Sequence, residues 1–166
     1  DLPFIKIPSD KNSDIPFIKN LKKIHKPIII SSGGTTIETL TEILEILNEK
    51  QIALLQCTSI YPCPSDKINL SVMNDFKDRF KIPVGFSSHN SSPILTAMAA
   101  AYGAQIIEVH VTLDRTLWGT DQAMSLGPRG GEILIRSIKQ FELAKGNPEK
   151  FVYPDESKTL SRTVGR

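Results

Sequence analysis

Short apolar runs rich in β-branched residues alternate along the chain with longer amphipathic stretches. This alternation is typical of βα units, whose strands pair in parallel and whose helices cover the sheet. The apolar runs predict five strands, at residues 4–7, 27–31, 52–57, 83–87 and 105–112. We therefore expect an α/β protein with a parallel sheet.

The amphipathic stretches predict helices at residues 15–24, 37–49, 69–80, 93–102 and 130–145. Thr36 is a suitable N-cap, Pro93 suits a first helical turn, and Gly103 and Gly146 are suitable helix stops. The periodicity is lost beyond Asn147. We predict one domain at residues 1–147, followed by an extended tail or linker at residues 148–166.

Every predicted strand is followed by hydroxyl, glycine or ionisable residues. In α/β barrels this end of the sheet is the active-site face, whereas a purely structural sheet needs turns there but no such gathering of polar groups. Five βα units are too few to close an eight-stranded barrel, and open sheet edges are a liability. The pattern leaves two possibilities, a doubly wound sheet or part of a larger barrel.

The composition, with 40% hydrophobic and 23% charged residues, is that of a soluble globular domain. A formal charge of only +2 and the lack of a basic patch interleaved with aromatics argue against a nucleic-acid partner. We find no membrane-length apolar stretch and no signal-peptide layout, so we expect a cytoplasmic protein without membrane contact. Cys57 and Cys63 are predicted to be reduced thiols.

Two histidines, His89 and His110, lie at the ends of two consecutive predicted strands. On neighbouring parallel strands their imidazoles would converge, and two imidazoles can bind one divalent ion with positions left for substrate or water. Glu108 would share a face with His110, as a third ligand or as a partner that orients an imidazole. The alternative is that each histidine is only hydrogen-bonded in a polar rim.

The turn at residues 31–36, Ser-Ser-Gly-Gly-Thr-Thr, opens onto a predicted helix and offers amide and hydroxyl groups to an anion. Such a turn is as often only a turn. Lys6 could add a positive charge at the same edge, although a lone lysine is usually solvated. Asp121 lies in a loop after the last strand, from which it could reach the pocket or simply cap a neighbouring segment.

Six motifs occur in order along the chain: Lys6-Ile-Pro-Ser9, Lys26-Pro-Ile-Ile-Ile-Ser-Ser-Gly33, Ala53-Leu-Leu-Gln-Cys-Thr-Ser-Ile-Tyr-Pro62, Pro83-Val-Gly-Phe-Ser-Ser-His89, Glu108-Val-His-Val-Thr-Leu-Asp114 and Gly119-Thr-Asp-Gln-Ala-Met-Ser-Leu126. Together they resemble the N-acetylneuraminate (sialic acid) synthase family, and the resemblance covers nearly the whole chain. It implies a partial (β/α)8 TIM barrel of about five parallel strands, beginning near the family's fourth strand.

The resemblance implies a transferase that condenses phosphoenolpyruvate with N-acetylmannosamine or a related N-acetylated sugar to a nonulosonic acid and phosphate. It further implies a divalent cation, Mn²⁺ foremost, with Mg²⁺ or Co²⁺ as alternatives. His89 and His110 match the family's metal ligands, and Asp121 matches a catalytic position near the sugar and the metal. The positions that match the phosphoenolpyruvate site are Lys6, Ser9, Ser31, Ser59, Tyr61 and Ser87.

The resemblance leaves the family's first three strands and a small following domain outside this sequence. We therefore expect little or no activity from the isolated chain, and either a homo-oligomer or association with the missing half-barrel. Departures from the family pattern at Lys11, Ser88, Val109 and Gly127 bear on metal affinity and turnover. Two other functions stay open: a non-catalytic half-barrel that binds another subunit, and another metal-dependent aldolase or lyase.

Overall fold

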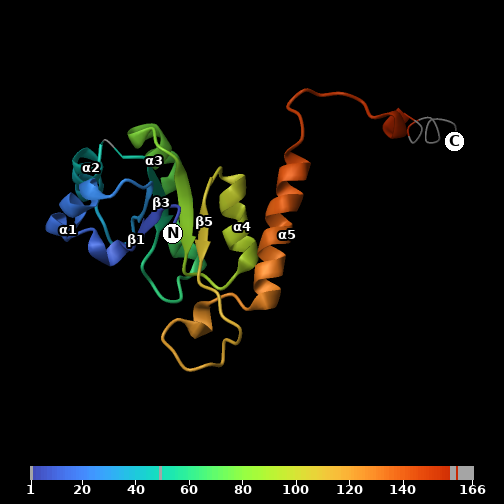
Figure 1. Cartoon of the computed structure of the whole chain (residues 1–166). Helices are drawn as coiled ribbons and strands as arrows, with labels where there is room; N and C mark the ends of the chain where they lie inside the picture. Colours follow the sequence, from blue (N-terminus) through green and yellow to red (C-terminus); the bar gives the residue numbers. More distant parts are fainter. Residues whose placement is uncertain (1, 49, 158–159, 161–166) are drawn as a thin grey trace.

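The chain folds into one parallel sheet flanked by helices, and the computed structural model describes residues 2–48, 50–157 and 160 (Figure 1). The strands pair in sequence order, each parallel to the next: β1 (Ile5–Ile7), β2 (Ile28–Ser31), β3 (Ile52–Cys57), β4 (Val84–Ser88) and β5 (Ile107–Val109). The helices are α1 (Ile15–Asn20), α2 (Ile37–Ile46), α3 (Val72–Phe80), α4 (Pro93–Ala101) and α5 (Pro128–Lys145). Short 3-10 turns lie at η1 (Ser9–Lys11), η2 (Leu21–Lys23), η3 (Ser65–Lys67) and η4 (Gln122–Met124).

This sequential order of parallel strands is that of half a (β/α)8 barrel, which confirms the partial-barrel prediction over the doubly wound alternative. In a doubly wound sheet the strand order reverses at a switch point, and here it does not. Within the described residues β1 and β5 each pair with one strand only, so the half-barrel has two open edges.

One face of the sheet packs against the helices and forms the main hydrophobic core. Alternate strand residues supply it, because successive side chains on a strand point to opposite faces. Its strand members include Ile7, Ile30, Leu54, Val84 and Phe86, all at most 2% exposed. The other face, which would line the barrel interior, is left free for polar groups at its carboxyl end.

A second, smaller core joins the last two helices to the sheet. Ala97, Leu126 and Leu134 are buried there, and Val109 and Ile138 pack against them. This cluster fixes β5 and the loop after it, which is the segment that carries His110 and Asp121.

The last strand is shorter than predicted. The apolar run at 105–112 predicts a strand throughout, but β5 ends at Val109, and beyond it only an isolated bridge joins Val111 to Leu126. His110 therefore follows the strand instead of lying within it. The pattern predicts too long a strand because it treats the apolar Val111 as a buried strand residue, whereas Val111 is 73% exposed.

Helix boundaries differ from the prediction where local backbone geometry intervenes. The stretch at 15–24 divides into α1 and η2, and the predicted start at Asn69 gives way to Val72 because Asn69 is left-handed, with φ 51°. The helix predicted to reach Glu49 ends at Ile46, and Glu49 lies outside the described residues. The helix predicted from 130 starts two residues earlier, at Pro128.

The predicted caps and stops are confirmed. Thr36 Oγ1 accepts the Thr39 amide at the start of α2, and Pro93 occupies the first turn of α4. Beyond Gly146 the chain runs away from α5 to one helical turn at 154–157 (Figure 1), and the rest of the predicted tail, 158–159 and 161–166, lies outside the described residues. Among the helices in the described ranges, none is long and apolar enough to cross a membrane.

Candidate active site at the carboxyl ends of the strands

A pocket of about 350 Å³ lies at the carboxyl ends of the strands. It is lined by all the predicted site residues except Ser59 and Asp121, together with Pro8, Cys57, Glu108 and Val109. Strand register explains part of this gathering, because Cys57 pairs with Ser87 and Ser87 pairs with Glu108 across β3, β4 and β5. The three side chains therefore project from one face at the same level of the sheet.

The Glu108 carboxylate contacts three other polar side chains of the pocket. One oxygen lies 3.0 Å from Lys6 Nζ, and the other accepts a hydrogen bond from Ser87 Oγ at 2.7 Å. Ser31 Oγ lies 3.4 Å from the same oxygen. These contacts tie β1, β2 and β4 to β5, so Glu108 belongs to the site although it was predicted only as a metal ligand or a partner of an imidazole.

The two histidines converge as predicted, with ring centroids 5.3 Å apart. His89 Nδ1 lies 2.8 Å from the carbonyl oxygen of Thr58, and since a carbonyl only accepts, Nδ1 carries the proton. The Tyr61 ring packs on His89 with centroids 4.1 Å apart, which helps to fix the imidazole. The Nε2 lone pair of His89 is thereby left for another partner.

Asp121 reaches the site from the loop after β5, at η4. Its Oδ2 lies 3.6 Å from His110 Nδ1, and both side chains are partly exposed. A carboxylate beside one ring nitrogen favours the tautomer whose other nitrogen can bind a metal. Asp121 is therefore positioned beside His110, while lying outside the pocket lining.

The donor set fits a divalent metal ion only in part. Imidazole nitrogens bind such ions at about 2.0–2.1 Å, so rings whose centroids are 5.3 Å apart can share one ion. In each histidine Nδ1 faces an oxygen, which leaves the Nε2 atoms as ligands. Across the described ranges, however, no three His, Cys, Asp or Glu side chains are placed to hold an ion together. Further ligands would come from substrate or water.

The close contact between Cys57 and His89 shifts the pKa values of both side chains. Burial opposes ionisation of the Cys57 thiol, but the hydrogen bond and charge of His89, at an Sγ to Nδ1 distance of 3.9 Å, outweigh it and lower the thiol pKa. Burial likewise disfavours charged His89, yet its contacts with Cys57 and Thr58 outweigh that effect and raise its pKa. Both cysteines are free, as predicted, and both are buried.

Tyr61 keeps its phenolic proton over a wider pH range than usual. Tyr61 is 52% exposed, and partial desolvation of its side chain is the main cause of its raised pKa, with Cys57 in its ionised form adding to the effect. The hydroxyl is therefore available as a neutral hydrogen-bond donor at the rim of the pocket.

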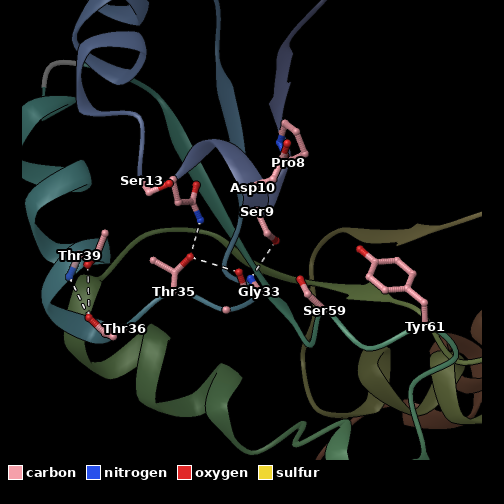
Figure 2. Close-up of a pocket in the computed structure, with 12 residues that line it drawn as sticks. Pro8, Ser9, Asp10, Ser13, Gly33, Thr35, Thr36, Thr39, Ser59 and Tyr61 are labelled. Carbon is pink, nitrogen blue, oxygen red and sulfur yellow. Dashed lines mark hydrogen bonds between the residues drawn. The ribbon is translucent and has the colours of Figure 1, made fainter.

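Ser9 and Ser59 meet at a glycine turn beside the two-histidine pocket (Figure 2). The Gly33 amide donates to Ser9 Oγ at 2.9 Å, and the Thr35 amide donates to the Ser32 carbonyl. Two amides of the predicted anion-binding turn are thus already used within the protein. Ser59 lines a neighbouring pocket of about 560 Å³, which shares Ser9 and Tyr61 with the first.

The fold and the site define a class: half of a (β/α)8 barrel with a polar, two-histidine pocket at its strand ends. The chain belongs to the NeuB family, whose family model matches residues 1–150. This confirms the sialic acid synthase resemblance.

Two synthases are similar to this chain in sequence, each at about one-third identity. The chain is 35% identical to an N,N'-diacetyllegionaminic acid synthase of Campylobacter jejuni, over 96% of this chain and 49% of the relative. It is 34% identical to the N-acetylneuraminate-9-phosphate synthase of Homo sapiens, over 94% of this chain and 44% of the relative. The chain spans about half the length of these relatives.

A solved structure shows the same fold. The N-acetylneuraminic acid (sialic acid) synthetase of Leptospira borgpetersenii, crystallised with citrate, superposes with a TM-score of 0.85. Its identity to this chain is 26%, and the match covers 97% of this chain and 57% of that one. The half-barrel therefore corresponds to part of a larger synthase fold.

Proposed function

We propose that the chain forms the metal- and phosphoenolpyruvate-binding half of a nonulosonic acid synthase. The reaction joins phosphoenolpyruvate to N-acetylmannosamine or a related N-acetylated sugar and releases phosphate. The observation that carries the proposal is one pocket that contains both histidines, Lys6 and a set of serine hydroxyls. The names of the relatives, which are sialic and legionaminic acid synthases, support the same class of product.

The pocket chemistry suits a small anion that carries a phosphate and a carboxylate. Lys6 supplies a positive charge, and Ser31 and Ser87 supply hydroxyls from β2 and β4, the strands on either side of β3. Ser9 and Ser59 extend this polar surface toward the glycine turn. Such groups orient an anion through charge-assisted hydrogen bonds.

His89 and His110 are the residues that would hold a divalent cation, with Mn²⁺ proposed and Mg²⁺ or Co²⁺ as alternatives. A bound cation would supply Lewis acidity that polarises the aldehyde oxygen of the sugar. Thr58 and Tyr61 fix the His89 ring, and Asp121 stands beside His110 where it can orient that ring and contact the acceptor.

In this reaction C3 of phosphoenolpyruvate forms a bond to the aldehyde carbon, water adds at C2, and the C2–O bond to phosphate breaks. The residues of this chain bind and orient the reactants for these steps. The rest of the binding site would come from a complementary half-barrel that pairs with the open edges at β1 and β5. We therefore propose association with such a half, within a homo-oligomer or as a separate partner.

Binding and turnover measurements on the purified chain test this function. We expect Mn²⁺ and phosphoenolpyruvate to bind, each detected by calorimetry, with Mn²⁺ binding lost in His89→Ala and His110→Ala. We expect little or no phosphate release with N-acetylmannosamine from the chain alone. Absence of both binding events would contradict the proposed site, and release at ordinary synthase rates would contradict its incompleteness.

A further inference from the structure

The carboxylate of Glu108 already occupies the donors that the proposed function assigns to the substrate anion. Lys6 Nζ lies 3.0 Å from one of its oxygens, and Ser87 Oγ donates to the other at 2.7 Å. Ser31 Oγ lies 3.4 Å from that second oxygen. An ammonium and two hydroxyls around one carboxylate form the kind of set that would bind the carboxylate of a small ligand.

Because Glu108 uses the hydrogen-bond donors of the pocket, these donors are not available to a ligand at the same time. A serine hydroxyl has a single proton, so Ser87 cannot donate to a ligand oxygen while it donates to Glu108. The positive charge of Lys6 is likewise balanced by Glu108, at a site where the two side chains are only 26% and 37% exposed. An arriving anion therefore competes with a carboxylate that is part of the protein.

We propose that Glu108 is an internal counter-anion of the phosphoenolpyruvate subsite and sets its selectivity among anions. This inference rests on the proposed function for the identity of the substrate. A ligand with one anionic group replaces the contacts of Glu108 without adding others. A ligand that carries both a phosphate and a carboxylate can also engage hydroxyls beyond the reach of Glu108, such as those of Ser9 and Ser59.

The geometry disfavours the two roles that the sequence left open for Glu108. His89 Nδ1 is directed at the Thr58 carbonyl, and His110 Nδ1 faces Asp121, so neither ring is oriented by Glu108. Both carboxylate oxygens of Glu108 are engaged by Lys6 or the serines, and within the described residues Glu108 forms no three-ligand cluster with the two histidines. Glu108 acts through the anion-binding side chains and is a positioning residue.

Anion binding to Glu108→Gln tests the proposal, with inorganic phosphate and phosphoenolpyruvate as probes at fixed ionic strength. Removal of the Glu108 charge should tighten phosphate binding about tenfold. Phosphoenolpyruvate binding should tighten less, so the ratio of the two affinities, which favours phosphoenolpyruvate in the parent chain, should become smaller. Glu108→Ala should have the same effect on phosphate binding. If one of the two variants does not fold, the other still tests the proposal. Glu108→Asp, which keeps the charge, should bind phosphate like the parent chain.

Two further variants separate a local effect from a general one. Glu132→Gln removes the same charge from an ion pair with Arg129 on α5, away from the pocket lining, and should leave phosphate affinity unchanged. Lys6→Met combined with Glu108→Gln should abolish the gain, because the gain depends on the freed ammonium.

Unchanged or weaker phosphate binding in Glu108→Gln and Glu108→Ala would overturn the proposal. An equal gain in Glu132→Gln would also overturn it, as would a gain that persists when Lys6→Met is combined with Glu108→Gln. Mn²⁺ binding is measured on the same samples. A gain in phosphate affinity without Mn²⁺ binding would defeat the proposed function alone, whereas Mn²⁺ and phosphoenolpyruvate binding without the gain would defeat the role of Glu108 alone.

Discussion

Substitution of Gly33 by alanine is predicted to damage the anion subsite more than the fold. A Cβ placed on Gly33 would overlap Ser59 Oγ and would lie 2.8 Å from Ser9 Oγ and 3.1 Å from Cys57 Sγ. The backbone is not in the left-handed region at this residue, so the effect is steric. The two serines must rotate away, and both are proposed to bind phosphoenolpyruvate.

The energetic cost follows from the same contacts. Overpacking of a well-packed site costs about 1–3 kcal/mol, and rotation of Ser9 also removes its bond from the Gly33 amide, worth about 1 kcal/mol. Serine side chains are short and can turn toward the neighbouring pocket, which places the expected destabilisation near the lower end, at about 1–2 kcal/mol. Loss of two hydroxyl contacts should weaken phosphoenolpyruvate binding at least tenfold.

Urea unfolding and calorimetric titration of Gly33→Ala measure both effects. The matched control is Gly131→Ala in α5, where an added Cβ meets nothing within 4 Å and a helical alanine should stabilise by up to about 1 kcal/mol. Parent-like phosphoenolpyruvate affinity in Gly33→Ala would refute the placement of the substrate beside Ser9 and Ser59.

Three other changes have defined outcomes. His89→Ala or His110→Ala should weaken Mn²⁺ binding at least tenfold by calorimetry, and parent-like affinity in both would contradict the shared site. Leu54→Ala, in the fully buried centre of β3, should cost about 2–5 kcal/mol in urea unfolding. Thr36→Ala should cost about 1 kcal/mol through loss of the α2 cap, and a neutral result would contradict its bond to the Thr39 amide.

The order of the elements was predictable because it depends on local patterning. Alternating apolar runs locate all five strands, and capping residues such as Thr36 locate helix starts. The end of β5 was not predictable, since Val111 is apolar but exposed and pairs only through an isolated bridge. The left-handed backbone of Asn69 similarly shortened a helix that its side-chain pattern would have extended.

The site was predictable where a residue sits at a strand end. His89 and His110 converge because their strands are neighbours, and register brings Ser87 level with Glu108. The contact of Glu108 with Lys6 was not predictable, because it joins β5 to β1 across the open face of the sheet. The link between Cys57 and His89 also depends on side-chain packing that spacing alone does not reveal.

One pocket of this chain is proposed to bind both a divalent metal ion and phosphoenolpyruvate. The most direct test is the ³¹P relaxation rate of phosphoenolpyruvate in the presence of the chain and Mn²⁺, since bound paramagnetic Mn²⁺ relaxes only nearby phosphorus. We predict strong enhancement with the parent chain and its loss in both His89→Ala and Lys6→Met. Phosphoenolpyruvate that binds without enhancement, or enhancement that persists in His89→Ala and His110→Ala, would contradict the claim.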